Sequence, residues 1–303
     1  MDEARKKTDR DLLRMEKKIS KIYRQAQKEI TEKWNNYMKR GQKRLSALYD
    51  SYKNEKDPDK KAKALQKYQD ALHAYTFENK RYKDMINETT LRLANVNKIA
   101  LAYINGKMPR IYTINYNQID PKAIQLGIDF TIVDEGTVER LIKDGDIQLP
   151  YKTLNISKDQ RWNTKKLNSS LLQGILQGES IVKIAQRILP IISNNENAAI
   201  RNARTMVTGA ENKGRLDRYY DLEERGAILT KVWIATGDSR TRDWHAYMDG
   251  QEIDIHAKFT DGLGNRLEYP GDPSAPPATV YNCRCSMKTH ILGIRKNGRA
   301  RYI

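Results

Sequence analysis

The chain has 303 residues, of which 39% are hydrophobic and 31% charged, and its mean hydropathy is −0.80. This length suits one large or two moderate domains, and the polar composition favours exposed helices over one compact globule. The sequence contains no apolar run of membrane-spanning length and no secretory signal at its start, so we expect a protein made in a cytosol.

The formal net charge of +17 is concentrated in the N-terminal third of the sequence. Residues 1–110 contain 28 Lys and Arg against 15 Asp and Glu, whereas residues 111–303 contain 27 against 23. A basic segment attracts polyanions through its long-range field, so nucleic acid or an acidic protein surface is the expected partner. A solvated helix face without a partner is the alternative.

The first predicted element is a long helix, because apolar side chains recur in steps of three and four from Asp11 onward. The run Asp57-Pro58-Asp59 interrupts this pattern, and a second helical stretch is predicted from about residue 60 to 104. Residues 1–105 therefore predict a basic helical arm or hairpin. Its apolar stripe must pack against another helix, either in the same chain or in a second copy, so self-association is a further expectation.

Basic side chains of this arm are the predicted DNA-binding residues. They would contact phosphates of double-stranded DNA without reading its bases, which gives salt-dependent, non-specific affinity. Aromatic side chains lie among them, and at helical spacing these are more typical of packing than of base stacking. The predicted DNA-binding residues are Lys17, Lys18, Lys21, Arg24, Lys28, Lys39, Arg40, Lys43 and Arg44.

A mainly helical middle domain is predicted over residues 106–226, after the break at Asn105-Gly106-Lys107-Met108-Pro109. It contains a short helical pattern near residues 137–142 and then three longer ones. These span about 158–173, 181–189 after the capping residue Ser180, and 195–224 before Arg225-Gly226.

The character of the sequence changes near Ile228, where residues 229–235 alternate like a half-buried strand. The remaining chain is rich in Gly, Asp, Asn and Pro and ends in a basic tail. Residues 227–303 therefore predict a small, loop-rich α+β module. The expected fold class of the whole chain is α+β, with a long N-terminal helical arm and central helices.

Four clusters in the last third of the chain occur in an order typical of one viral family. They are Ala198–Asn212, the stretch from Lys231 to Gly250, Tyr269–Pro273, and Asn282-Cys283-Arg284-Cys285. With the lead-in Leu172–Ile181, they make residues 110–290 resemble the Mu F-like head morphogenesis proteins of tailed phages. One departure is Met206, where many members of that family have a glutamate; Glu211 is the nearest substitute.

The resemblance implies a minor capsid protein of the virion that acts at the portal vertex of the phage head. The implied partners are the portal protein, a capsid or scaffold protein, and DNA, and the implied roles are head assembly and DNA packaging or ejection. The basic arm would supply the contact with DNA.

The two cysteines, Cys283 and Cys285, are too close in sequence for an ordinary disulfide. In a strand, residues i and i+2 share a face, so both sulfurs can reach one point, as in half of a zinc site. His245 and Asp249, at i and i+4, are the predicted further ligands, with Asp238, His256, Asp272 and His290 in reserve. The alternative is that both thiols are small buried groups and His245 is a hydrogen-bonding core residue.

A structural cluster is predicted around the same motifs. Asp238, Arg240, Arg242 and Asp272 would form a buried ion-pair network, and Asp238 would cap a helix starting near Thr241. Arg204 and Asn282 are assigned to this cluster through their motifs.

An enzyme is the second hypothesis: a metal-dependent nuclease or toxin-like activity of His245, Asp238 and the cysteine pair. Zinc-bearing His-Asn-His nucleases place an acid or a histidine before the catalytic histidine, whereas Trp244 precedes His245 here. The sequence also contains no Gly-rich phosphate loop and no serine–histidine–acid order. We therefore expect a structural and interaction protein without catalytic residues.

Overall fold

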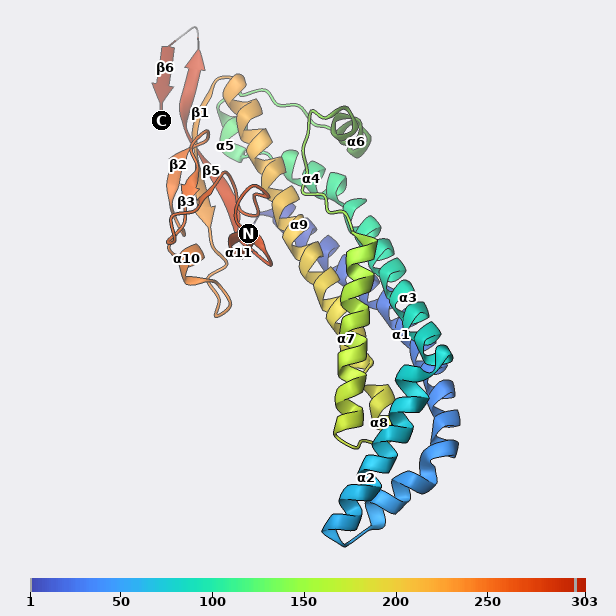
Figure 1. Cartoon of the computed structure of the whole chain (residues 1–303). Coiled ribbons are helices and arrows are strands. Elements are labelled where there is room, and N and C mark those ends of the chain that lie inside the picture. Colours follow the sequence, from blue (N-terminus) through green and yellow to red (C-terminus); the bar gives the residue numbers. More distant parts are fainter. Residues whose placement is uncertain (1, 297–298) are drawn as a thin grey trace. The chain divides into compact units, whose positions relative to one another are not determined.

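The computed structural model describes residues 2–296 and 299–303, and it contains long helices and a small C-terminal sheet (Figure 1). The chain forms two compact units, each built from separate stretches of sequence. Unit 1 comprises Met1–Lys17, Ala102–Lys152 and Ile200–Ile303, and unit 2 comprises Lys18–Leu101 and Thr153–Ala199. The domain boundaries predicted near residues 105 and 226 stay predictions.

Unit 2 is helical, and its first helices confirm the predicted hairpin. The break after α1 occurs where expected: Asp57 caps α2 by accepting from the backbone N–H of Lys60 at 2.9 Å, and Pro58 starts α2. A π-helical turn and Asn79 then interrupt the second stretch that was predicted as continuous. The bounds are α1 (Glu3–Asn54), α2 (Pro58–His73), η1 (Ala74–Glu78), α3 (Lys80–Asn105), α7 (Ile156–Leu176), α8 (Ile181–Gln186) and α9 (Leu189–Glu224), of which α1, α3 and α9 also contribute to unit 1.

The apolar stripe of α1 packs within the chain. Tyr23, Trp34 and Tyr37 are buried. The indole N–H of Trp34 donates to the Thr89 hydroxyl on α3 at 2.9 Å, and the Tyr37 hydroxyl donates to the carbonyl of Tyr75 at 2.7 Å. These aromatic side chains are packing residues, as their spacing predicted.

Unit 1 contains a four-stranded antiparallel sheet in the order β2-β1-β5-β6. Its core lies around Trp233, Phe259 and Met287. This module confirms the predicted α+β class. The further bounds are α4 (Met108–Tyr116), α5 (Pro121–Gln125), α6 (Glu135–Asp144), β1 (Ala227–Ile234), α10 (Asp243–Ala246), β2 (Glu252–Asp254), β3 (Phe259–Thr260), β4 (Arg266–Leu267), α11 (Pro277–Val280), β5 (Ser286–Lys296) and β6 (Arg299–Tyr302).

Among the residues that the structure describes, no helix is long and apolar enough to cross a membrane.

The predicted helices of the middle region are confirmed, but α9 begins at Leu189 rather than near residue 195. Pro190 lies in its first turn, where the missing N–H breaks no hydrogen bond of the helix.

Candidate functional site

The turn Asn282-Cys283-Arg284-Cys285 is held by polar side chains of α9. The hydroxyl of Thr205 accepts from the backbone N–H of Asn282 at 2.9 Å, and the hydroxyl of Thr208 donates to the carbonyl of Cys283 at 2.7 Å. The amide of Asn212 donates to the carbonyl of Cys285 at 3.3 Å. The motif on α9 therefore fixes the path of the cysteine turn.

Backbone conformation shapes the same turn. Asn282 has a φ of 56°, the left-handed region that Asn tolerates better than most residues. The two cysteines consequently lie in a turn that precedes β5 rather than in a strand as predicted. Beside the turn, α9 approaches the Tyr269–Pro273 loop through Gly209, where a Cβ would lie 2.8 Å from the carbonyl oxygen of Gly271.

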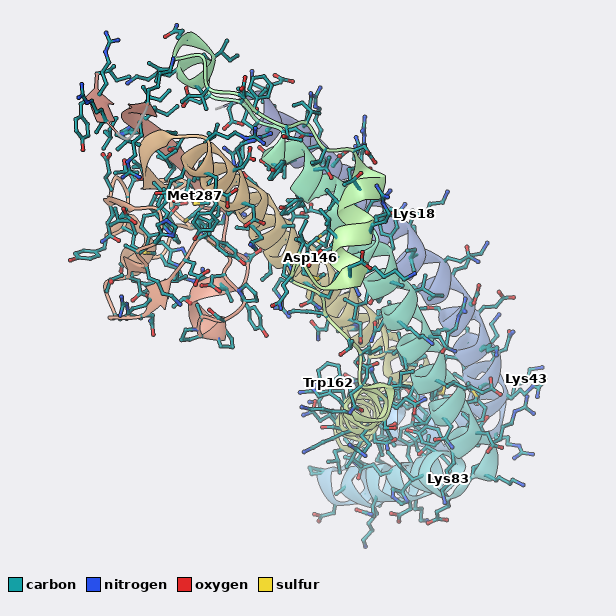
Figure 2. The ribbon with its side chains drawn as sticks, turned by 90° about the horizontal axis from the view of Figure 1, so that it is seen from above. Lys18, Lys43, Lys83, Asp146, Trp162 and Met287 are labelled. Atoms are coloured by element: carbon teal, nitrogen blue, oxygen red, sulfur yellow. The ribbon has the colours of Figure 1, made fainter. Side chains whose placement is uncertain are left out.

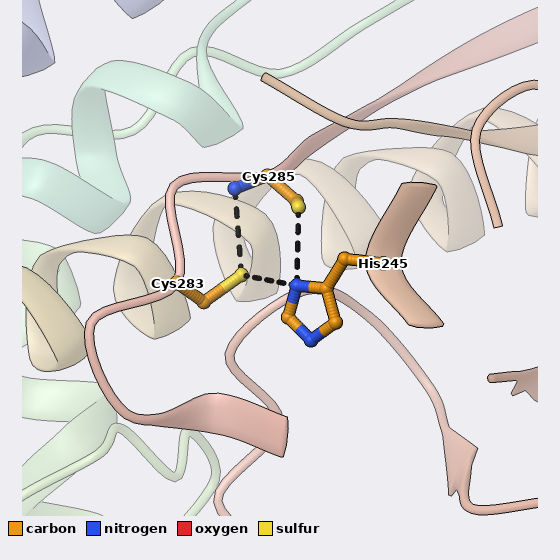
Figure 3. A group of neighbouring side chains, drawn as sticks. All are labelled: His245, Cys283 and Cys285. Atoms are coloured by element: carbon orange, nitrogen blue, oxygen red, sulfur yellow. Dashed lines mark hydrogen bonds between the residues drawn. The ribbon is translucent and has the colours of Figure 1, made fainter. Parts of the chain in front are cut away.

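His245, Cys283 and Cys285 converge on one point (Figure 3). The Nδ1 atom of His245 lies 3.6 Å from Sγ of Cys283 and 3.4 Å from Sγ of Cys285. The backbone N–H of Cys285 donates to Sγ of Cys283 at 3.4 Å. All three side chains are buried, and Nε2 of His245 has no hydrogen-bond partner among the described residues. We call these three residues the His-Cys-Cys group.

The thiols of the group titrate as a pair. A hydrogen bond from Cys283, and then His245, lowers the pKa of Cys285 below its ordinary value, although burial opposes this. The same hydrogen bond, together with burial, raises the pKa of Cys283. The pair thus favours one thiolate and one thiol.

Asp249, the fourth predicted ligand, is not part of this group. Its Oδ1 accepts from the backbone N–H of Ala235 at 2.8 Å. Asp249 lies four residues after His245, but α10 ends at Ala246, so the two residues do not share a helix face. The reserve ligands also have other contacts: Asp272 accepts from Glu268 and Ser274, His256 binds Glu223, and His290 binds Glu252.

The predicted network of Asp238, Arg240, Arg242 and Asp272 is not buried, and among the described residues only its Asp238–Arg240 pair is formed, at 3.9 Å on the surface. Asp238 is on the surface and pairs with both terminal nitrogens of Arg284 at 2.6 Å. This pair lowers the pKa of Asp238. Arg242 instead donates to the carbonyl of Tyr281. Oδ1 of Asp238 accepts from the backbone N–H of Arg240 within the same turn. Asp238 does not cap a helix, because α10 starts at Asp243 and the residue before it is Arg242.

Arg204 and Asn282 do lie at a common cavity of about 390 Å³, which Arg240 and Cys283 also line. The guanidinium of Arg204 donates to Glu16 at 2.6 Å. Part of the predicted structural set is therefore brought together, around the outer side of the cysteine turn.

A buried ionic cluster was missed by sequence reasoning. Glu211 accepts from Arg5 and from the hydroxyl of Ser286, both at 3.0 Å, and Arg215 pairs with Asp2 at 2.8 Å. The i, i+4 spacing of Glu211 and Arg215 was the only local signal. Their partners near residue 1 are more than 200 positions away in sequence.

The nine predicted DNA-binding side chains are all exposed on α1. Figure 2 shows Lys18 and Lys43 on the surface of this helix. No ion pair joins any of the nine to another residue within 2–296 or 299–303, whereas Arg14 and Lys33 of the same helix pair with Asp11 and Glu88. The nine charges are thus left uncompensated at short range.

Residues 165–288 match the family described as Phage Mu protein F like protein. A minor head protein, GP7 of Bacillus phage SPP1, is 23% identical over 276 residues, which cover 87% of this chain and 86% of that protein. An NAD(+)–arginine ADP-ribosyltransferase, EFV, of Enterococcus faecalis is 28% identical over 130 residues, which cover 43% of this chain. No solved structure matches the chain.

This chain covers very different shares of the two relatives. It spans 26% of the ADP-ribosyltransferase, so most of that enzyme has no counterpart in the alignment, whereas it spans nearly all of the minor head protein. The family match also contains the whole His-Cys-Cys group and the α9 motif that holds its turn. Residues 165–288 of the chain therefore form a Mu F-like region, and over most of its length the chain is similar to a minor head protein of a phage.

Proposed function

We propose that the protein is a minor head protein of a tailed phage, which acts at the portal vertex in head assembly and in DNA packaging or ejection. In this proposal, the exposed basic side chains of α1 contact double-stranded DNA without sequence preference. The partners would be the portal protein and a capsid or scaffold protein, and a second copy of the chain where several gather at the vertex. The similarity to a minor head protein over most of both chains supports the assembly role.

The observation that supports DNA contact best is the row of unpaired basic side chains on α1. Residues 18–44 span about 40 Å of helix at 1.5 Å per residue. Acidic residues in that span are few, namely Glu29 and Glu32. Lys and Arg that lack a protein partner can replace the counterions of phosphates, and the released counterions drive association.

The first test is the salt dependence of duplex DNA binding by the full chain. The variant replaces Lys39, Arg40, Lys43 and Arg44 with Gln. The logarithm of the binding constant falls linearly with the logarithm of the salt concentration, and each contacted phosphate adds about 0.9 to the steepness of this slope. The loss of four contacts should therefore make the slope shallower by about 3 to 4. Fluorescence anisotropy at several salt concentrations measures this slope.

A matched control removes the same charge from unit 1. Lys143, Arg266, Arg295 and Lys296 are exposed and form no ion pair with a described residue, and they are replaced with Gln. This control should retain the slope of the unmodified protein. Equal slopes for all three proteins would refute the proposed DNA contact of α1.

A second test concerns the role in the head. Phage particles assembled with the α1 variant should contain less DNA or eject it less completely, while particles with the unit 1 control should be normal. Normal heads, DNA content and ejection with the α1 variant would contradict the role in packaging or ejection.

The alternative function, metal-dependent catalysis by His245, Asp238 and the cysteines, finds less support in the geometry. Asp238 is paired with Arg284 at the surface, and the side chains of the His-Cys-Cys group are buried. Turnover by pure protein that His245→Ala abolishes while the melting temperature is unchanged would establish an enzyme. If the His-Cys-Cys group is structural, His245→Ala should instead lower the melting temperature of the protein.

A further inference from the structure

We propose that His245, Cys283 and Cys285 bind one zinc ion, which fixes the turn before β5 to α10. The ligand atoms would be Nδ1 of the histidine and Sγ of each cysteine. This proposal is independent of the proposed role in DNA packaging.

The distances fit zinc. With Zn–S near 2.3 Å and Zn–N near 2.0–2.1 Å, tetrahedral angles place a nitrogen and a sulfur about 3.5–3.6 Å apart. The two observed distances from Nδ1, 3.6 and 3.4 Å, lie close to this value. All three ligand atoms lie within 4.8 Å of one another, so one ion can reach each of them.

Hydrogen bonding alone explains the arrangement less well. Nδ1 of an imidazole has a single in-plane site, which can donate or accept one hydrogen bond. Here two sulfurs approach that one atom, and both are buried. A cation between the three atoms accounts for both approaches, and it would compensate the charge that the two sulfurs take on as ligands in an apolar core that contains Trp233.

The surrounding backbone suits thiolate ligands. The N–H of Cys285 points to Sγ of Cys283, a donor that stabilises a metal-bound thiolate. The carbonyls on both sides of Arg284 are held by Thr208 and Asn212 of α9. The two cysteine ligands are therefore positioned by hydrogen bonds that exist without the ion.

Sulfur and imidazole ligands select zinc over magnesium or calcium, which prefer oxygen. Among the described residues the group offers three ligands, and the carboxylates considered from the sequence have other partners: Asp249 binds Ala235, Asp238 binds Arg284, and Asp272 binds its own turn. Burial of all three ligand side chains favours a structural role for the ion.

The experiment measures metal in full-length protein purified under reducing conditions without chelator or histidine tag. Elemental analysis should find about one zinc per chain, and X-ray absorption at the zinc edge should resolve two sulfurs at about 2.3 Å and one imidazole nitrogen at about 2.0 Å. A strong chelator should lower the melting temperature, because binding energy at such a site is folding energy. Readdition of zinc should restore it.

Variants assign the ligands. Cys283→Ser and Cys285→Ser should each lose the zinc, whereas the control Asp249→Asn, which keeps an acceptor for Ala235, should retain it. If the Ser variants fail to fold, cobalt substitution of the unmodified protein decides: bound cobalt should show thiolate charge-transfer absorption and tetrahedral d–d bands. Metal below about a tenth of an equivalent with no cobalt spectrum, or loss of zinc in Asp249→Asn alone, would overturn the assignment.

Discussion

Lys231 is a fully buried base in the core of the C-terminal module. Its ammonium donates to the carbonyl of Glu268 at 2.9 Å and lies 5.3 Å from the ring centroid of Phe259. Burial lowers the pKa of Lys231 to about 8, against partial compensation by Glu268 and Asp254. The neutral form is thus favoured in the folded state more than in the unfolded chain.

The resulting prediction concerns the free energy of unfolding as a function of pH. Between the folded pKa near 8 and the unfolded value near 10.5, the unfolded chain binds more protons at this site, so stability contributed by Lys231 rises with pH. The contribution should be about 1–3 kcal/mol across this window. In Lys231→Met this rise should be absent.

Denaturant titrations at pH 7.5 and pH 9.5 measure the effect as the difference between the unmodified protein and Lys231→Met. The difference removes the opposite contribution of buried tyrosines such as Tyr219, whose pKa is raised by burial. Parallel stability curves for the two proteins over this range would mean that Lys231 is charged in the folded state as readily as in water.

At the scale of elements, α9 approaches the Tyr269–Pro273 loop closely beside the candidate site. A Cβ on Gly209 would lie 2.8 Å from the carbonyl oxygen of Gly271 and 3.0 Å from Cγ of Pro150. Gly209→Ala should therefore destabilise the protein by about 1–3 kcal/mol, although alanine is the better helix former. The fall in melting temperature measures it.

Gly136 is the matched control, because it also lies in a helix, α6, but is exposed. A Cβ there would meet only the Oδ1 atom of Asp134, at 3.1 Å. Gly136→Ala should be neutral or stabilising by up to about 1 kcal/mol. If Gly209→Ala were equally harmless, α9 and the loop could separate without cost.

The sequence predicted best those features that depend on nearby residues. The break between α1 and α2 follows from Pro58 and the carboxylate of Asp57 that caps α2, and the aromatic spacing on α1 correctly indicated packing. The convergence of the two cysteines and His245 was also anticipated, although Asn282 places the cysteines in a turn rather than a strand.

Long-range pairing was not predictable in the same way. Asp249 was chosen because it follows His245 in the same motif, but α10 has only four residues and Asp249 binds Ala235 instead. Asp238 pairs with Arg284, 46 positions away, and Glu211 pairs with Arg5, 206 positions away. These ion pairs depend on how α9 and the strands pack in three dimensions. The spacing of residues along a single sequence does not predict this packing.

At the scale of the whole molecule, the positive charge belongs mainly to unit 2. Its two stretches contain 26 Lys and Arg against 13 Asp and Glu, whereas unit 1 contains 29 against 25. Unit 2 therefore has 13 of the 17 excess positive charges. A field of this sign accelerates encounters with DNA even through side chains that never touch it.

Long-range attraction of DNA by unit 2 can be separated from direct phosphate contact by α1 in an experiment, which rests on the proposed binding of DNA by α1. Neutralising Lys60, Lys61, Lys63 and Lys67 of α2 should lower the association rate with duplex DNA at low salt, and the difference should vanish as the Debye length falls to about 10 Å near 0.1 M salt. The equilibrium salt slope should stay that of the unmodified protein, because no contacted phosphate is lost. Stopped-flow association at several salt concentrations measures the rate.

Two results would contradict this prediction. A salt slope reduced as strongly as in the α1 variant would mean that DNA contacts α2 as well as α1. An association rate that is unchanged at low salt would mean that the field of unit 2 does not guide the encounter with DNA.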